Sequence, residues 1–100
     1  MIAVDDYVFD TLMRDLVGHD RQPSAYLVYL CLWRERHRAG GDPVQLSLQE
    51  LAGRTGLSKR AVQDAISRLH RRKLIGIKRA GITAIPEYSV RTPWRREKGD

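Results

Sequence analysis

The sequence predicts a mainly α-helical domain with a small β-hairpin, and three observations support this fold class. Apolar residues recur at helical spacing over most of the chain before residue 73. Two of the helical segments, about 47–56 and 58–72, are separated only by a short turn that contains glycine. The residues that follow, 75–91, alternate as strands do. We therefore expect a core of three or four helices and one hairpin.

The first helix is predicted from about residue 5 to residue 17. Aspartates at positions 5, 6 and 10 suit the positive end of a helix dipole, and Gly18 is expected to end the helix. The apolar stripe of this helix consists of Val8, Phe9, Leu12, Met13, Leu16 and Val17. It is wider than packing on one side requires, so we expect either a homodimer formed through this helix or simple closure of the monomer core.

A second helix is predicted from Pro23, a typical first-turn proline, to about His37. It is apolar on most sides as far as Trp33, which is typical of a buried central helix. Residues 40–43, Gly-Gly-Asp-Pro, form a loop, and Val44 to Leu46 are expected to form a short strand that pairs with the hairpin.

Capping residues mark the next two helices. Ser47 and Glu50 have the Ser-x-x-Glu spacing of a capping box, so a short helix begins after Ser47. Gly56 ends it, since glycine adopts a left-handed conformation without a Cβ penalty. Ser58 is placed to cap the following helix.

That following helix has one apolar and one polar face. Val62, Ala65, Ile66 and Leu69 lie on the apolar stripe. The opposite side holds Lys59, Arg60, Gln63, Ser67 and Arg71, whose side chains can reach base edges or phosphates. The alternative is an ordinary amphipathic helix hairpin with a solvated basic face.

The hairpin is predicted to begin at Ile75 and to turn at Ala80-Gly81. The return strand is expected from Ile82 to Val90, with Pro86 at an edge or a bulge. Lys78 and Arg79 lie near the predicted tip, where they can contact a sugar-phosphate backbone. The residues expected to pack on the helical core are Ile77, Tyr88 and Val90.

Several motifs between Val44 and Val90 are similar to those of winged helix-turn-helix domains. These motifs are S-L-Q-E-L-A, G-L-S-K-R-A-V, I-S-R-L-H-R-R-K-L-I and the closing Y-S-V. They resemble the bacterial and phage group that includes replication-initiator and GntR-like regulator domains, and Y-L-V-Y-L-C-L-W resembles its preceding helix. The chain departs from that group at Ala61, where threonine is common, at Asp64, and at Lys73, where glycine is common.

The resemblance implies a recognition helix, about 58–72, that enters the DNA major groove, and a wing on the backbone. It implies one domain over residues 1–92, with the helix-turn-helix at about 47–73 and the wing at about 75–91. Residues 93–100 are expected to be a frayed basic tail. The candidate DNA-binding residues are Ser58, Lys59, Arg60, Gln63, Ser67, Arg68, Arg71, Lys78 and Arg79.

The distribution of charge favours a nucleic-acid partner. The net charge is +6 and the pI is about 10.0. Residues 1–57 hold 6 Lys/Arg and 8 Asp/Glu, net −2, whereas residues 58–100 hold 12 Lys/Arg and 4 Asp/Glu, net +8. An anionic membrane is a rival partner, but no segment approaches the ~20 apolar residues of a spanning helix. An acidic start and a single cysteine predict a cytoplasmic, nucleoid-associated protein.

The sequence predicts that the protein is not an enzyme. Cys31 lies in an apolar helix, and His19, His37 and His70 lack metal-ligand spacing. No phosphate-binding glycine loop is present, so we expect no cofactor, no metal and no small-molecule ligand.

Two classes of function remain open. The first is double-stranded DNA binding by a transcriptional regulator or a replication-initiator module. The second is a winged-helix protein-interaction module within a nucleoprotein complex, in which the basic surface meets an acidic partner. The second is favoured by Asp64 and by three aromatic residues that we expect to be exposed, Tyr7, Tyr29 and Trp94.

Overall fold

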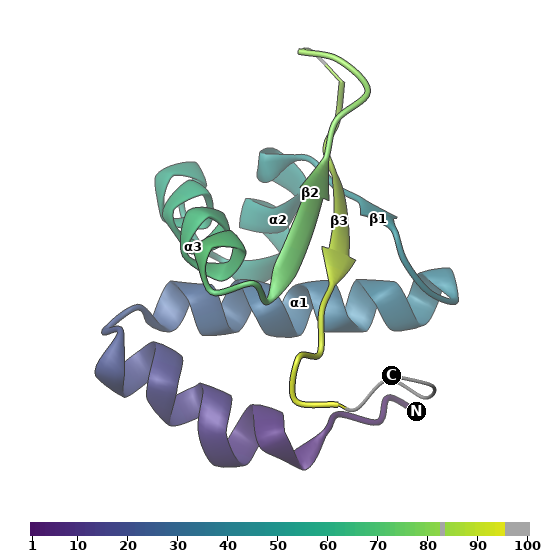
Figure 1. Ribbon diagram of the computed structural model, residues 1–100. Helices are drawn as coiled ribbons and strands as arrows, with labels where there is room; N and C mark the ends of the chain where they lie inside the picture. Colours follow the sequence, from purple (N-terminus) through teal and green to yellow (C-terminus); the bar gives the residue numbers. More distant parts are fainter. Residues whose placement is uncertain (83, 96–100) are drawn as a thin grey trace.

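The chain folds into a bundle of helices with a small sheet along one side (Figure 1). The structure, a computed structural model, describes residues 1–82 and 84–95. The three labelled helices are α1 (Pro23–Ala39), α2 (Leu48–Thr55) and α3 (Lys59–Arg71). The strands are β1 (Val44–Gln45), β2 (Ile75–Lys78) and β3 (Glu87–Val90). A mainly helical chain with a small antiparallel sheet is therefore confirmed.

The N-terminal helix is wider than an α-helix. Its two parts, η1 (Val8–Leu12) and η2 (Arg14–His19), make i→i+5 hydrogen bonds, as in the bond from the Asp20 amide to the Asp15 carbonyl at 2.8 Å. Its apolar residues repeat every four positions, which exceeds the about 3.6 residues of an α-turn and suits the wider winding. The prediction that Gly18 ends this helix is wrong, since the helix continues to His19.

The central position predicted for the second helix is confirmed. The buried residues of α1 include Val28, Tyr29 and Leu32, and Figure 1 shows α1 between the N-terminal helix on one side and α3 with the sheet on the other. The helix continues to Ala39, beyond the predicted end, because the left-handed residue is Gly40 (φ 78°). The prediction that Tyr29 is exposed is wrong, since it is fully buried and its hydroxyl donates to the Arg91 carbonyl at 2.9 Å.

The sheet has the strand order β1-β3-β2 and is antiparallel throughout. The predicted pairing of the first strand with the hairpin is confirmed, with Val44 opposite Tyr88. The predicted return strand from Ile82 is wrong, because β3 begins only at Glu87. Pro86 has no amide hydrogen for the ladder. Residues 79–82 and 84–86 lie outside the ladder, so the connection between β2 and β3 is longer than the predicted two-residue turn.

Residues 93–95 pack against the domain rather than fraying. The Trp94 ring stacks on Tyr7 with centroids 4.6 Å apart. The Trp94 indole donates to Asp5 at 2.8 Å, and the Arg95 guanidinium donates to both Asp5 carboxylate oxygens at 2.6 Å. Trp94 can therefore close one end of the core. The basic composition of these residues, on which the prediction of a frayed tail was based, does not indicate this packing. The rest of the predicted tail, 96–100, lies outside the described residues.

Candidate nucleic-acid interface

Local hydrogen bonds set the geometry of α2 and α3. The Glu50 amide donates to the Ser47 hydroxyl at 3.0 Å, and the Ser47 amide donates to the Glu50 carboxylate at 3.1 Å. Gly56 is left-handed at φ 80°, and the Ala61 amide donates to the Ser58 hydroxyl at 3.0 Å. The predicted capping box, helix end and second cap are thus confirmed. Together they end α2 and begin α3 within a few residues, so a tight turn joins the two helices.

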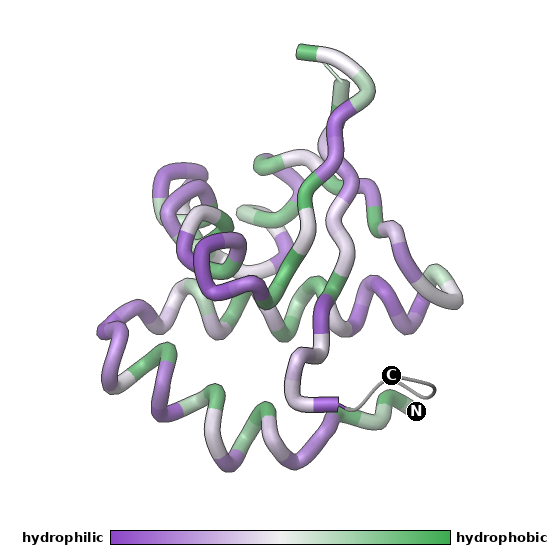
Figure 2. The backbone as a smooth tube through the Cα atoms, in the orientation of Figure 1, coloured by the Kyte–Doolittle hydropathy of each residue, from purple (hydrophilic) through white to green (hydrophobic). Residues whose placement is uncertain are grey.

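The outer face of α3 is polar and basic. Val62, Ala65, Ile66 and Leu69 are buried, as predicted. The exposed residues outside this stripe, on or near the opposite side, include Lys59, Arg60, Gln63, Ser67 and Arg71. Ser58, at the start of the helix, is also exposed. Figure 2 shows this outer side as hydrophilic along the helix. The structure therefore brings six of the nine predicted site residues together on one continuous surface.

Arg68 belongs to a different environment from the other arginines of α3. It is half-buried, and its Nε donates to the Gln22 side-chain oxygen at 3.2 Å. This contact turns the side chain toward the start of α1 and away from the outer face. Arg68 therefore borders the basic face instead of standing at its centre.

An open groove of about 500 Å³ runs between α3 and the residues that precede and begin α1. It contains three arginines, of which Arg21 and Arg71 are exposed. The groove is lined by Arg21, Gln22, Ser24, Ala61, Asp64, Ser67, Arg68 and Arg71. Sequence reasoning missed Arg21, because 47 positions separate it from Arg68 and no local pattern links them. Its backbone is left-handed at φ 52°, at the sharp bend between two helices.

Asp64 is the single carboxylate of α3. Its Oδ1 lies 3.8 Å from Arg60 Nε, and both side chains are largely exposed. Asp64 is four residues from both Arg60 and Arg68, so its spacing allows either pair, but Arg68 bonds to Gln22 instead. The exposed pair contributes little to stability, so its main effect is to lower the positive charge of the face.

Arg72 is engaged in the fold and does not add to the free basic face. Its guanidinium donates to both oxygens of Asp20 at 3.3 Å and lies 3.5 Å from Asp15. Burial opposes ionisation of Asp20. However, a hydrogen bond with His19 and the charge of Arg72 lower its pKa below the usual range. This buried carboxylate therefore ties the N-terminal helix to the end of α3.

The hairpin extends beyond the helices (Figure 1). Lys78 ends β2, Arg79 begins the loop, and both are exposed, as predicted near a tip. The prediction that Ile77 packs on the core is wrong. Ile77 is 37% exposed, because the end of β2 projects past the helices, whereas Ile75 and Tyr88 are each 1% exposed.

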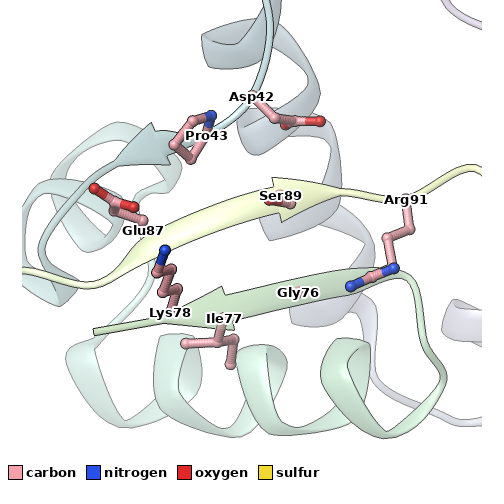
Figure 3. Close-up of a pocket in the computed structure, with 8 residues that line it drawn as sticks. All are labelled: Asp42, Pro43, Gly76, Ile77, Lys78, Glu87, Ser89 and Arg91. Carbon is pink, nitrogen blue, oxygen red and sulfur yellow. The ribbon is translucent and has the colours of Figure 1, made fainter. Parts of the chain in front are cut away.

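The outer face of the sheet carries charges of both signs. Figure 3 shows Lys78 beside Glu87 and the Arg91 guanidinium close to Gly76. Lys78 and Glu87 are opposite each other in the strand register. The Arg91 guanidinium would meet a Cβ at Gly76 at 2.9 Å, so glycine leaves it room. The mixed charge makes this face a poorer anion site than the outer face of α3.

The cysteine, the metal-ligating residue types and the length of the helices bear on other functional classes. Burial raises the pKa of the Cys31 thiol, which keeps it in the less reactive protonated form. Within residues 1–82 and 84–95, no three His, Cys, Asp or Glu side chains converge to hold a metal ion. Over the same residues, every helix is too short or too polar to cross a bilayer.

No family model, curated protein or solved structure matches the chain. Any inference about its function therefore rests on its own residues.

Proposed function

We propose that this protein binds double-stranded DNA, with α3 in the major groove and the β2–β3 hairpin along the sugar-phosphate backbone. The observation that carries the proposal is the exposed, basic face of α3, together with cations on the elements beside it. Arg21 lines the groove next to α1, and Lys78 and Arg79 are exposed at the end of β2, the strand that packs beside α3. A helix that enters a major groove has a phosphate backbone on either side.

The order of elements supports the same proposal. A short strand between α1 and α2, a tight turn before α3 and a hairpin after it match the winged helix-turn-helix arrangement that the motifs resemble. A transcriptional regulator and a replication-initiator module share this DNA-binding geometry, so the proposal covers both.

Within this geometry the side chains divide into two roles. Gln63 and Arg60 point outward from the middle and the first turn of α3, where bidentate contacts to adenine and guanine are feasible. Arg21, Lys78 and Arg79 are at the margins and would neutralise phosphates. Specificity would thus reside in α3, and much of the affinity at its borders.

Salt-dependent binding to a random-sequence duplex tests the proposal. The double substitution Arg21→Ala with Arg71→Ala, two exposed arginines of the groove beside α3, should reduce the slope of log K against log salt by about 0.9 for each phosphate that is no longer neutralised. The matched control, Arg34→Ala with Arg38→Ala, removes the same charge from exposed positions near the end of α1. It should change the slope far less. Salt-independent binding of the unaltered protein, or equal reductions of the slope in both double variants, would overturn the proposal.

A second candidate function is a protein-interaction module. It is favoured by two apolar residues between β2 and β3, because Ile82 is 95% and Ile85 is 46% exposed. Apolar residues in such a loop suit contact with another protein. The same titration separates the candidates, since a pure protein-interaction module would not bind random duplex.

A further inference from the structure

The N-terminal helix presents an apolar surface that the monomer leaves uncovered. Residues four apart form neighbouring rows along this helix. Val8, Leu12 and Leu16 form the buried row, at 0%, 2% and 0% exposure. Phe9, Met13 and Val17 form the next row, which we call the apolar row, at 48%, 40% and 37% exposure. Figure 1 shows α1 along one side of this helix and open space along the side away from α1.

A third row beside the apolar row is charged. It contains Asp6, Asp10 and Arg14, all of which are exposed. Among the ion pairs and side-chain hydrogen bonds of residues 1–82 and 84–95, none involves Asp10 or Arg14. Asp10 lies three residues before Met13, and Arg14 lies one residue after it. The row therefore changes sign from its N-terminal to its C-terminal end.

We propose that the apolar row is the docking surface for a second copy of this chain, with the two N-terminal helices antiparallel and the two-fold axis level with Leu12, beside Met13. Because Asp10 and Arg14 lie two residues before and after Leu12, this pairing places Asp10 of each copy opposite Arg14 of the other, so two opposite-charge pairs flank the apolar contact. A symmetric interface needs a self-complementary surface of this kind. Parallel two-fold pairing would instead place the two charged rows on opposite edges of the contact, where they could not pair.

The position of this surface is compatible with DNA binding but does not depend on it. In Figure 1, α1 separates the N-terminal helix from the hairpin and from most of α3, so docking there leaves the basic face open. The apolar row is short, which puts the interface below the about 1,200 Å² of standard complexes. We therefore expect weak association in free solution. If the proposed DNA binding holds, association strengthens when two copies occupy adjacent half-sites.

Cysteine cross-linking without DNA tests the position of the axis. In a Cys31→Ser background, Met13→Cys places one thiol of each copy near the axis. With oxidised glutathione as the oxidant, it should form disulfide-linked dimers about tenfold faster than Gln49→Cys, an exposed control on α2. Equal rates for the two variants would overturn the proposed surface.

Sedimentation of charge variants tests the antiparallel pairing. Asp10→Arg alone and Arg14→Asp alone should each weaken association by about fivefold, because both cross-copy pairs become repulsive. The combined variant should restore it, because its pairs are opposite again. Both substitutions lie at exposed positions, and unfolding curves check that the three variants fold. No rescue by the combined variant, or a monomer up to millimolar concentration, would refute the pairing. Neither result bears on DNA binding, since no DNA is present.

Discussion

Lys73 holds a backbone conformation that normally favours glycine. Its φ is 60°, and it follows Arg72, the C-cap residue of α3. The Leu74 amide donates to the Leu69 carbonyl at 2.9 Å, and the Lys73 amide donates to the His70 carbonyl at 3.0 Å. These two bonds form a Schellman motif, in which the residue after the cap is left-handed. Glycine, which is common at this place in winged helix-turn-helix domains, adopts the left-handed conformation without a Cβ penalty.

Replacing Lys73 by glycine should therefore stabilise the protein. The left-handed conformation disfavours side chains by about 1–2 kcal/mol, and the greater freedom of glycine in the unfolded chain offsets part of the gain. We expect a net increase of roughly 0.5–1 kcal/mol in the free energy of unfolding, measured with urea. The same change at Gln63, in the middle of α3, should instead destabilise by about 1 kcal/mol. Destabilisation at both positions would contradict this explanation of the helix end.

Asp64 should limit affinity for DNA without reading a base. Its carboxylate lies on the groove side of α3, 3.8 Å from Arg60. Asp64→Asn removes a negative charge from the proposed phosphate path, so binding to random duplex at low salt should tighten by about two- to fivefold. Asp6→Asn, on the N-terminal helix, serves as the control for net charge. Weaker binding of Asp64→Asn to every duplex would mean that the carboxylate contacts the DNA directly.

The hairpin, as an element, should add affinity with little specificity. Lys78 and Arg79 are exposed where β2 passes into the loop. Replacing both by alanine should weaken binding to specific and random duplexes about equally, and should lower the salt slope by roughly 0.9 for each phosphate that these cations neutralise. The measurement is binding over a range of salt concentrations. An unchanged slope would mean that the hairpin faces away from the duplex.

The helical elements could be predicted from sequence because their signals are local. The capping box at Ser47, the glycine at 56 and the apolar stripe of α3 each lie within one or two turns of the chain. The hairpin was harder to predict. Ile77 is exposed because β2 extends past the helices, and β3 begins only after Pro86, which has no amide hydrogen for the ladder. Neither feature follows from the alternation of apolar and polar residues alone.

The candidate site shows the same division. Arg60, Ser67 and Arg71 follow from helical periodicity, which places them opposite the buried stripe. The bond from Arg68 to Gln22 and the groove that includes Arg21 arise only when the start of α1 packs beside α3. Contacts between residues so distant in sequence depend on tertiary packing, which local patterns do not specify.

In the whole molecule, Asp5 joins the two ends of the described chain. It accepts hydrogen bonds from Trp94 and Arg95, while the rings of Trp94 and Trp33 lie stacked with centroids 6.4 Å apart. The hydrogen bond from Arg95 is the largest influence on Asp5, and the net effect lowers the pKa of that carboxyl below its usual range. The packing of the N-terminus and residues 93–95 against α1 therefore depends in part on the ionised carboxylate of Asp5.

This arrangement predicts a loss of stability in acid. A lowered folded-state pKa stabilises the protein fully above the ordinary carboxyl pKa of about 4, and the contribution disappears as pH falls toward the folded-state value. Asp5→Asn should therefore lower the free energy of unfolding at pH 7 and flatten its decline between about pH 5 and pH 2. Asp6→Asn is the control, since its carboxylate makes no hydrogen bond or ion pair with residues 1–82 and 84–95. Equal pH profiles for the two variants would contradict a special role for Asp5.

We propose above all that α3 and the hairpin form the DNA-contacting surface of the molecule. The most direct measurement is an NMR titration of the isotope-labelled chain with a short duplex, following every assigned backbone amide. We predict that the largest shifts fall in α3, at Arg21 and around Lys78 and Arg79, and that the end of α1 near Arg38 changes little. Shifts concentrated around Arg34, Arg38 and Arg54, or no shifts at a salt concentration low enough for phosphate contacts, would contradict this proposal.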